Sequence, residues 1–204
     1  LLFKKKLNSK FCNSLINYFD NENSFKDSHV INNVHFSELS FYNEWNVNIR
    51  YMIDELDNNL QSVLCEYYDC FIDESHYMAH EIKERNYDVF NRCDKFSIRK
   101  YNKDSIKDQF RHDFTGHPDT LYRQLSVIFY LNDVPDGGGE QFFVSHGEER
   151  VTIKPKIGDV LVFPSNFPFH HRSSLPISNN KYVVTTWITN FYQRWKQTNE
   201  DITS

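Results

Sequence analysis

The sequence predicts an α+β protein that is mainly β, in which N-terminal helices support an antiparallel sandwich or barrel. Before residue 96, apolar residues recur every three or four positions, which is the period of a helix. From Phe96 onward they alternate or form short runs, as in strands. Aromatic residues make up 16% of the 204 residues, which also favours strands because aromatic side chains suit a half-buried pleated surface. We expect one domain, with residues 1–95 as helical support and loops, 96–192 as the core and 193–204 as a tail.

The N-terminal region contains three predicted helices. Ser9–Asp20 places four apolar side chains on one face, and Ser9 is the expected N-cap. Apolar residues from Ile49 to Tyr67 repeat at three and four, which predicts a long amphipathic helix. A further helix is expected over Ser75–Glu84. Residues 21–47 are rich in Asn and Ser, and should form loops with one or two short strands.

Short strands should make up the second part of the chain. Turn sequences separate them, notably Pro135–Gly139 and Lys156–Asp159. Strands at this spacing indicate an antiparallel sandwich or barrel and not β-α-β units. The predicted strands are Phe96–Tyr101, Gln124–Leu131, Gln141–Val144, Val151–Ile153, Val160–Phe163 and Tyr182–Asn190.

Composition excludes several classes of protein. A net charge of −5 argues against a general nucleic-acid binder, which would be basic. No apolar run reaches the length of a membrane span, and the lysine-rich start lacks the apolar stretch of a secretory signal. The four cysteines form no CxxC pair, so we expect reduced thiols. A cytoplasmic protein that binds neither nucleic acid nor membrane is the expectation.

Two polar side chains come directly before the most apolar predicted strand. His117 and Asp119 lie two residues apart at its entrance, so they point to the same side of an extended chain. His170 and His171 follow another strand and offer a third ligand. Two imidazoles and one carboxylate, without thiolate, form the facial triad that holds Fe(II) and leaves positions open. The pattern predicts an iron site, although His-x-Asp alone also occurs by chance.

Lys181 sharpens this prediction. It lies ten residues after His171 and six before Trp187, in NNKYVVTTWI. A basic side chain that reaches into a barrel from the final strand needs an anion there. An open iron beside a buried cation suits 2-oxoglutarate, whose 2-oxo acid end chelates metal and whose far carboxylate would pair with the lysine. The sequence therefore predicts Fe(II) and the cosubstrate 2-oxoglutarate.

At these residues the chain resembles the Fe(II)/2-oxoglutarate-dependent dioxygenases, on their prolyl 4-hydroxylase-like branch. The resemblance covers residues 96–192, with a looser likeness around Phe11–Phe19. It implies a double-stranded β-helix (jelly roll) buttressed by N-terminal helices. The motifs that carry it are HPD (117–119), RQLSVIFYLND (123–133), GGGEQFF (137–143), IKPKIGDVLVFPSNFPFHH (153–171) and LPISNNKYVVTTWI (175–188).

The resemblance implies His117, Asp119 and His171 as the iron ligands. His112 and Asp113 are an alternative, since they sit where some relatives place His-x-Asp. Adjacent residues of a strand point to opposite faces, however, so this pair is disfavoured. The choice of His171 over His170 follows the family pattern around FPSNF.

The resemblance also implies a cosubstrate pocket. Lys181 matches the basic residue that pairs with the C5 carboxylate of 2-oxoglutarate. Tyr130 and Tyr101 match tyrosines of that pocket, and Trp187 matches a packing residue of the closing strand. O₂ is expected as the oxidant and ascorbate as the reductant.

The expected reaction is hydroxylation of an unactivated C–H, with a prolyl residue in a peptide or protein as the leading substrate. Retention of Asp119 favours hydroxylation over halogenation, because halogenating relatives replace that carboxylate. A free amino acid or another small molecule is the alternative substrate. The non-enzymatic alternative is a metal-binding jelly roll without oxygenase activity, which leaves Lys181 without a purpose. A zinc hydrolase would need a general base, and none is evident near the triad. The oligomeric state is left open.

Overall fold

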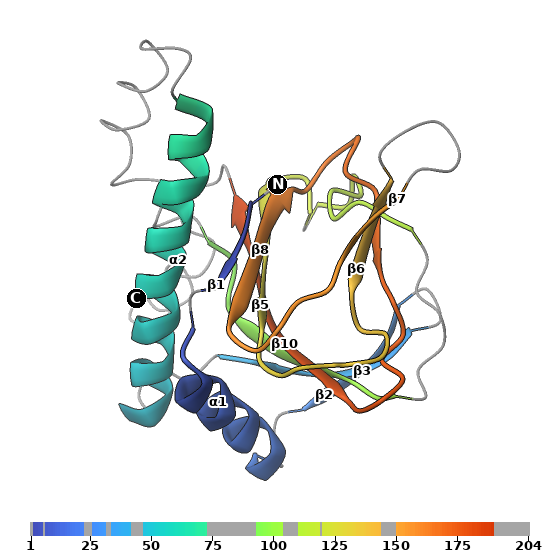
Figure 1. The fold of residues 1–204 in the computed structure, drawn as a ribbon. Coiled ribbons are helices and arrows are strands. Elements are labelled where there is room, and N and C mark those ends of the chain that lie inside the picture. The colour runs from blue at the N-terminus through green and yellow to red at the C-terminus, as the bar shows by residue number, and fades with distance from the viewer. Residues whose placement is uncertain are drawn as a thin grey trace, which may run out of the picture.

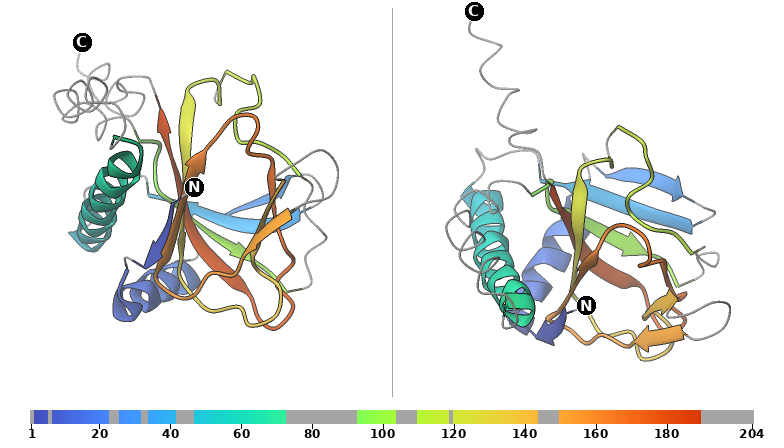
Figure 2. Two further views of the ribbon diagram at one scale, coloured as in Figure 1. Left: turned by 45° about the horizontal axis from the view of Figure 1, so that its top comes forward. Right: turned by 90° about the horizontal axis from the view of Figure 1, so that it is seen from above.

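Two β-sheets face each other, and two helices pack on the outer face of the larger sheet (Figures 1 and 2). The computed structural model describes residues 2–5, 7–22, 26–31, 34–41, 47–72, 93–103, 110–118, 120–143 and 150–189. Its strands are β1 (Leu2–Lys5), β2 (Asp27–Ile31), β3 (Val34–Ser40), β4 (Ser97–Tyr101), β5 (Arg123–Tyr130), β6 (Glu140–Phe143), β7 (Arg150–Ile153), β8 (Asp159–Pro164), β9 (His171–Ser173) and β10 (Lys181–Thr189). The large sheet has the order β1-β8-β5-β10-β4-β3-β2 and the small sheet β7-β6-β9.

The helices are α1 (Ser9–Asn21) and α2 (Val47–Ile72), which confirms two of the three predicted helices. The expected N-cap of α1 is wrong by one residue. Asn8 has extended backbone and its side-chain oxygen accepts a hydrogen bond from Phe11 N at 2.8 Å, so Asn8 is the cap and Ser9 begins the helix. The helix predicted over Ser75–Glu84 and the tail 193–204 lie outside the described residues.

All six predicted strands are present, with ends shifted by at most one residue where they are described. Two further strands were missed. β1 pairs with β8 along the edge of the large sheet, and the three-residue β9 pairs with β6 in the small sheet. β2 and β3 form a hairpin that extends the large sheet beyond β4, which matches the one or two strands expected in residues 21–47.

Alternation along the central strands creates two separate cores. On β5, Leu125, Val127 and Phe129 belong to a cluster shared with α1 and α2, which includes Leu15 and Leu60. Neighbouring residues point the other way, because successive side chains of a strand face opposite sides. The side chains on this other face join a second cluster, which fills the space between the sheets. Its buried members are Phe36, Tyr101, Tyr130, Phe142, Ile153, Leu161, Phe163 and Val183.

Cys12, Cys65 and Cys93 are free thiols, as expected, and the side chain of Cys70 lies outside the described residues. Among the helices that the structure describes, none is both long and apolar enough to cross a membrane.

Asp57 is a site of electrostatic strain on α2. Burial raises the pKa of its carboxyl to about 6, and the neighbouring Asp54 carboxylate adds to the rise. Because the folded state binds this proton more tightly than the unfolded state, stability falls as pH rises through the interval between about 4 and 6. Asp57→Asn should therefore stabilise the protein at pH 7 by about 1–2 kcal/mol, after allowing for the solvent screening of a partly exposed group.

Urea denaturation at pH 7 and at pH 3.5 measures this effect. The gain should be lost at the lower pH, where the carboxyl is protonated in both states. Asp54→Asn on the exposed side of the helix serves as the control and should give the smaller gain. An equal gain for Asp57→Asn at both pH values would show that the carboxyl's charge is not the cause.

Candidate functional site

A pocket opens between the two sheets and takes its walls from both. The large sheet contributes the inward-facing residues of β4, β5 and β10, and the small sheet contributes Glu140, His171 and Ser173. Arg111 and Asp113 close one side of the pocket. Inward-facing residues on β10 are Lys181, Val183, Thr185 and Trp187, which alternate with side chains of the helix-facing core such as Tyr182 and Val184.

His171 presents one ring nitrogen to this pocket. The residue is 2% exposed, and its Nδ1 lies 3.2 Å from the carbonyl oxygen of Phe169. Since a carbonyl can only accept, this contact places a hydrogen on Nδ1. A carbonyl that accepts from one ring nitrogen in this way leaves Nε2 as the nitrogen that can bind a metal. The Phe163 ring meets the imidazole edge to face at 4.6 Å and fixes its plane.

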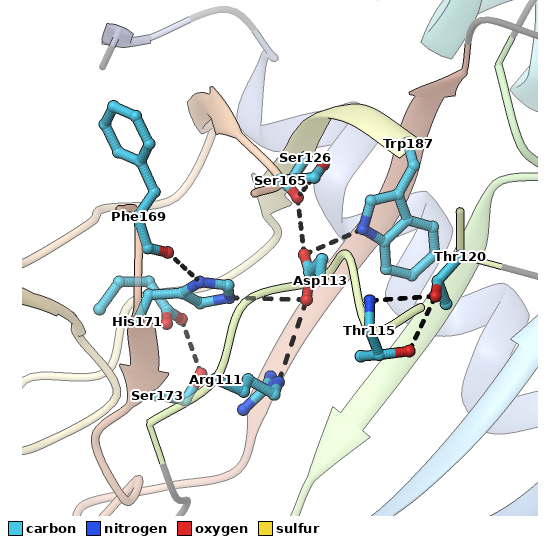
Figure 3. A network of polar contacts seen from close by, with 11 residues as sticks. Arg111, Asp113, Thr115, Thr120, Ser126, Ser165, Phe169, His171, Ser173 and Trp187 are labelled. Carbon is cyan, nitrogen blue, oxygen red and sulfur yellow. Dashed lines mark hydrogen bonds and ion pairs between the residues drawn. The ribbon is translucent and has the colours of Figure 1, made fainter. Parts of the chain in front are cut away.

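The carboxylate that faces His171 is Asp113 (Figure 3). Its Oδ1 lies 3.7 Å from His171 Nε2. Its Oδ2 accepts hydrogen bonds from Ser126 Oγ at 2.6 Å and Trp187 Nε1 at 2.9 Å. A short antiparallel bridge holds the two segments together, because Arg111 N donates to His171 O and His171 N donates to Arg111 O. The side chain of Asp113 is therefore both oriented and held beside the imidazole.

Asp113 is ionised at neutral pH. Burial alone would raise the pKa of its carboxyl, but interaction with His171 and Arg111, together with hydrogen bonds from Ser126 and Trp187, lowers it to about 2. A carboxylate must be ionised to bind a metal, so Asp113 is prepared for that role.

Asp113 and His171 together fit part of a divalent-metal site. They supply one oxygen and one nitrogen donor, both directed at the same small volume and both held by outer-shell partners. Within the described part of the chain, no third His, Cys, Asp or Glu joins them. Arg111 Nε lies 4.0 Å from Asp113 Oδ1 on the pocket side. A metal held here by described residues would keep most of its coordination positions for other ligands.

The predicted ligands His117 and Asp119 fare differently. His117 is exposed on a turn, where its carbonyl oxygen accepts hydrogen bonds from Thr120 N and Leu121 N, and it is not among the residues that line the pocket. Asp119 lies outside the described residues, so the triad of His117, Asp119 and His171 stays a prediction.

The sequence alone disfavours Asp113 as a ligand, because adjacent His112 and Asp113 cannot both face one site. His112 and Asp113 do point apart, as expected of neighbours in an extended chain. His112 instead packs on His170, with ring centroids 4.9 Å apart, while Asp113 turns to His171. Alternation places Arg111 and Asp113 on the same face, and this is the sequence signal that puts the Asp113 carboxylate in the pocket lining. His171 lines the pocket, whereas His170 is not part of its lining.

Lys181 lies at the other end of the pocket, where it is 2% exposed. Its Nζ donates to Glu140 Oε1 at 2.5 Å and to Ser173 Oγ at 3.1 Å. The rings of Tyr130 and Tyr101 flank the ammonium at 5.3 and 5.7 Å. Burial and the charge of Glu140 raise the pKa of Tyr130 well above its ordinary value, so it remains a neutral phenol. Glu140 was not identified from the sequence.

Comparison with known proteins agrees with this arrangement. The family model of the 2OG-Fe(II) oxygenase superfamily matches residues 96–189, the segment that builds the pocket. Residues 96–189 are thus similar to the 2OG-Fe(II) oxygenase superfamily. The two-sheet fold is accordingly the double-stranded β-helix that the resemblance implied. No curated protein matches the chain.

Solved structures of prolyl hydroxylases share the fold. A prolyl hydroxylase from Trichoplax adhaerens, in complex with a peptide fragment of the hypoxia inducible factor oxygen degradation domain, has a TM-score of 0.64 at 14% identity, covering 100% of this chain and 86% of that one. A viral collagen prolyl hydroxylase from Paramecium bursaria Chlorella virus-1, in its 2OG complex, has a TM-score of 0.57 at 16% identity, covering 92% and 94%. A Pseudomonas putida prolyl-4-hydroxylase has a TM-score of 0.56 at 15% identity, covering 92% and 91%.

Removing either donor of the Asp113–His171 pair should abolish metal binding. Loss of an outer-shell partner typically costs about 10–100-fold in metal affinity, so Asp113→Ala or His171→Ala should lower Mn(II) affinity by more than about 100-fold. Titration of Mn(II), followed by the electron paramagnetic resonance of the free ion, measures this directly.

His170→Ala is the matched control, because it removes an adjacent imidazole that faces away from the pocket, and it should bind Mn(II) like the wild type. His117→Ala and Asp119→Ala test the predicted turn ligands in the same titration. Wild-type affinity in Asp113→Ala, combined with loss of affinity in Asp119→Ala, would show that Asp119 and not Asp113 is the carboxylate ligand.

Proposed function

We propose that the protein is an Fe(II)- and 2-oxoglutarate-dependent oxygenase that hydroxylates a prolyl residue in a peptide or protein. The observation that supports this most is the pairing of His171 and Asp113 at one end of a pocket that has Lys181 at the other. The similarity of residues 96–189 to the 2OG-Fe(II) oxygenase superfamily supports the oxygenase class, and the prolyl substrate is the finer part of the proposal.

His171 and Asp113 would hold the iron, and Asp119 stays the predicted further ligand. Bound Fe(II) with 2-oxoglutarate and O₂ supplies the oxidising chemistry that attacks an unactivated C–H bond. What the protein contributes is position and shelter. Ser126 and Trp187 hold the Asp113 carboxylate in one rotamer, and the Phe169 carbonyl holds His171 in one tautomer.

Water exclusion is the second contribution of the chain. Phe142 and Phe163 pack against the His171 ring, and Val183 lines the wall next to Lys181. An apolar wall at the reacting centre keeps water away from a reactive oxidant and strengthens the polar contacts that remain. Tyr101, Tyr130 and Lys181 would then orient the cosubstrate from the far end, with ascorbate as the expected external reductant.

A peptide substrate is favoured over a free amino acid by two features. The Trichoplax adhaerens relative of the same fold was solved with a peptide. In this chain, β2 and β3 extend the large sheet past β4, on the side where Phe36 packs on Tyr101. An extended sheet beside the pocket offers more surface to a chain-like substrate than a small molecule requires.

Turnover assays test this proposal. The protein, Fe(II), 2-oxoglutarate and ascorbate should release succinate in the presence of proline-containing peptides and add 16 Da to the peptide, as measured by mass spectrometry. Free amino acids should give neither product.

Controls separate the possible failures. His171→Ala should form no succinate with any substrate. Matched peptides with alanine in place of proline should stay unmodified. Turnover confined to free amino acids would overturn the prolyl assignment and keep the oxygenase. An absence of the weak visible band of an Fe(II)–2-oxoglutarate chelate under anaerobic conditions would instead favour a non-catalytic jelly roll.

A further inference from the structure

The cations that line the pocket in the described part of the chain each have a carboxylate of their own. This neutrality is unexpected in a site that must receive a doubly charged acid. The three pairs, with nitrogen–oxygen distances, are Lys181–Glu140 at 2.5 Å, Arg99–Glu38 at 2.6 Å and Arg111–Asp113 at 4.0 Å.

The Lys181–Glu140 pair is the most deeply buried of the three. The two side chains are 3% and 2% exposed, against 16% for each side chain of the Arg99–Glu38 pair. Ser173 completes a closed set, because its hydroxyl donates to Glu140 Oε1 at 2.7 Å and accepts from Lys181 Nζ at 3.1 Å. Lys181 has three N–H donors, and two of them are committed within the protein.

Backbone geometry holds Glu140 at this position. Glu140 pairs directly with Ser173 across β6 and β9, so both side chains point to the same side of the small sheet. Gly139 lets the strand begin close to β7, since a Cβ there would lie 2.5 Å from the carbonyl oxygen of Ile153. The carboxylate is therefore built into the sheet and is not a loop side chain that happens to reach the lysine.

An incoming carboxylate meets a fixed competitor. If the far carboxylate of a dicarboxylic acid approached Lys181 with Glu140 in place, two negative charges would share one buried ammonium. The second carboxylate would cost free energy through repulsion and lost solvation, since one lysine compensates only one of the two carboxylates. Binding through Lys181 thus requires Glu140 to give up its contact.

From this geometry we propose that Glu140 is a built-in counter-ion of Lys181 that determines cosubstrate selectivity. It lowers affinity for 2-oxo acids with a far carboxylate, so the wild-type pocket discriminates weakly between 2-oxoglutarate and a 2-oxo acid without that group, such as 2-oxobutyrate. The inference rests on the proposed function for the assignment of this pocket to the cosubstrate. The competition for Lys181 itself is a property of the protein alone.

Glutarate tests the competition without any metal, because it carries two carboxylates and lacks the chelating 2-oxo group. Isothermal titration calorimetry of glutarate into the full chain, with chelator present, compares the wild type with Glu140→Gln. The amide keeps the shape of the side chain and removes its charge. The affinity for glutarate should rise by about tenfold or more in the variant, since the buried Lys181 ammonium becomes available to pair with a carboxylate of the ligand.

Asp136→Asn is the matched control. It removes one carboxylate from an exposed loop and leaves the Lys181–Glu140 and Arg99–Glu38 pairs of the pocket intact. It should not reproduce the rise. A double variant, Glu140→Gln with Lys181→Gln, should return glutarate binding to the wild-type level. No gain in Glu140→Gln, or an equal gain in Asp136→Asn, would overturn the proposal.

A measurement on the wild type covers the case in which Glu140→Gln fails to fold. With Mn(II) in the metal site, 2-oxoglutarate and 2-oxobutyrate should bind within about threefold of one another, a difference of less than 1 kcal/mol. A preference of about 100-fold for 2-oxoglutarate would show that Lys181 is free to bind it, and would overturn the proposal. Failure of the proposed function would appear separately, as an absence of succinate formation, while the metal-free glutarate result would still stand.

Discussion

Both faces of β10 are buried, and this constraint fixes the position of the pocket. Tyr182, Val184 and Ile188 pack into the core beneath the helices, so Val183, Thr185 and Trp187, which alternate with them, face the other sheet. A register shift of one residue would move Lys181 into the apolar core and bring Tyr182 into the pocket. Burial of the apolar face of β10 thus fixes which side chains of the strand point into the pocket. The pocket therefore forms only when the helix-facing core is folded.

Aromatic contacts hold the small sheet against the large one, and they fix where the His171 ring lies in the pocket. Phe142 meets Phe163 at 5.0 Å, and Phe163 meets His171 at 4.6 Å, so a residue of each sheet packs against the imidazole. The donors of the site come from opposite sides of this core. His171 belongs to the small sheet. Ser126 and Trp187, which orient the Asp113 carboxylate, belong to the large sheet. The backbone bridge between Arg111 and His171, together with Ser126 and Trp187 on the large sheet, therefore sets the distance between the Asp113 and His171 side chains.

Local patterns predicted much of the fold, and contacts between distant segments explain the rest. The period of two identified β4, β5, β8 and β10 of the large sheet, and the period of three to four identified α1 and α2. β9 has three residues, too few to show a period, and its pairing with β6 lies about 30 positions away in sequence. Of the site, Lys181 and His171 were expected in the pocket. Asp113 depends on the bridge between Arg111 and His171, and the Glu140–Lys181 pair spans 41 positions, so no local pattern marks either one.

The Lys181–Glu140 pair also links the stability of the fold to ligand binding. A lysine this deeply buried destabilises a protein when it has no counter-ion, because the lost hydration of the ammonium is not compensated. A pocket that relied on its ligand for that compensation would be stable only when loaded. Glu140 supplies the compensation from within the sheet, so the empty pocket is stable and the ligand must exchange one ion pair for another. The Glu140 carboxylate thus stabilises the pocket without ligand and, by the same contact with Lys181, weakens the binding of a carboxylate ligand.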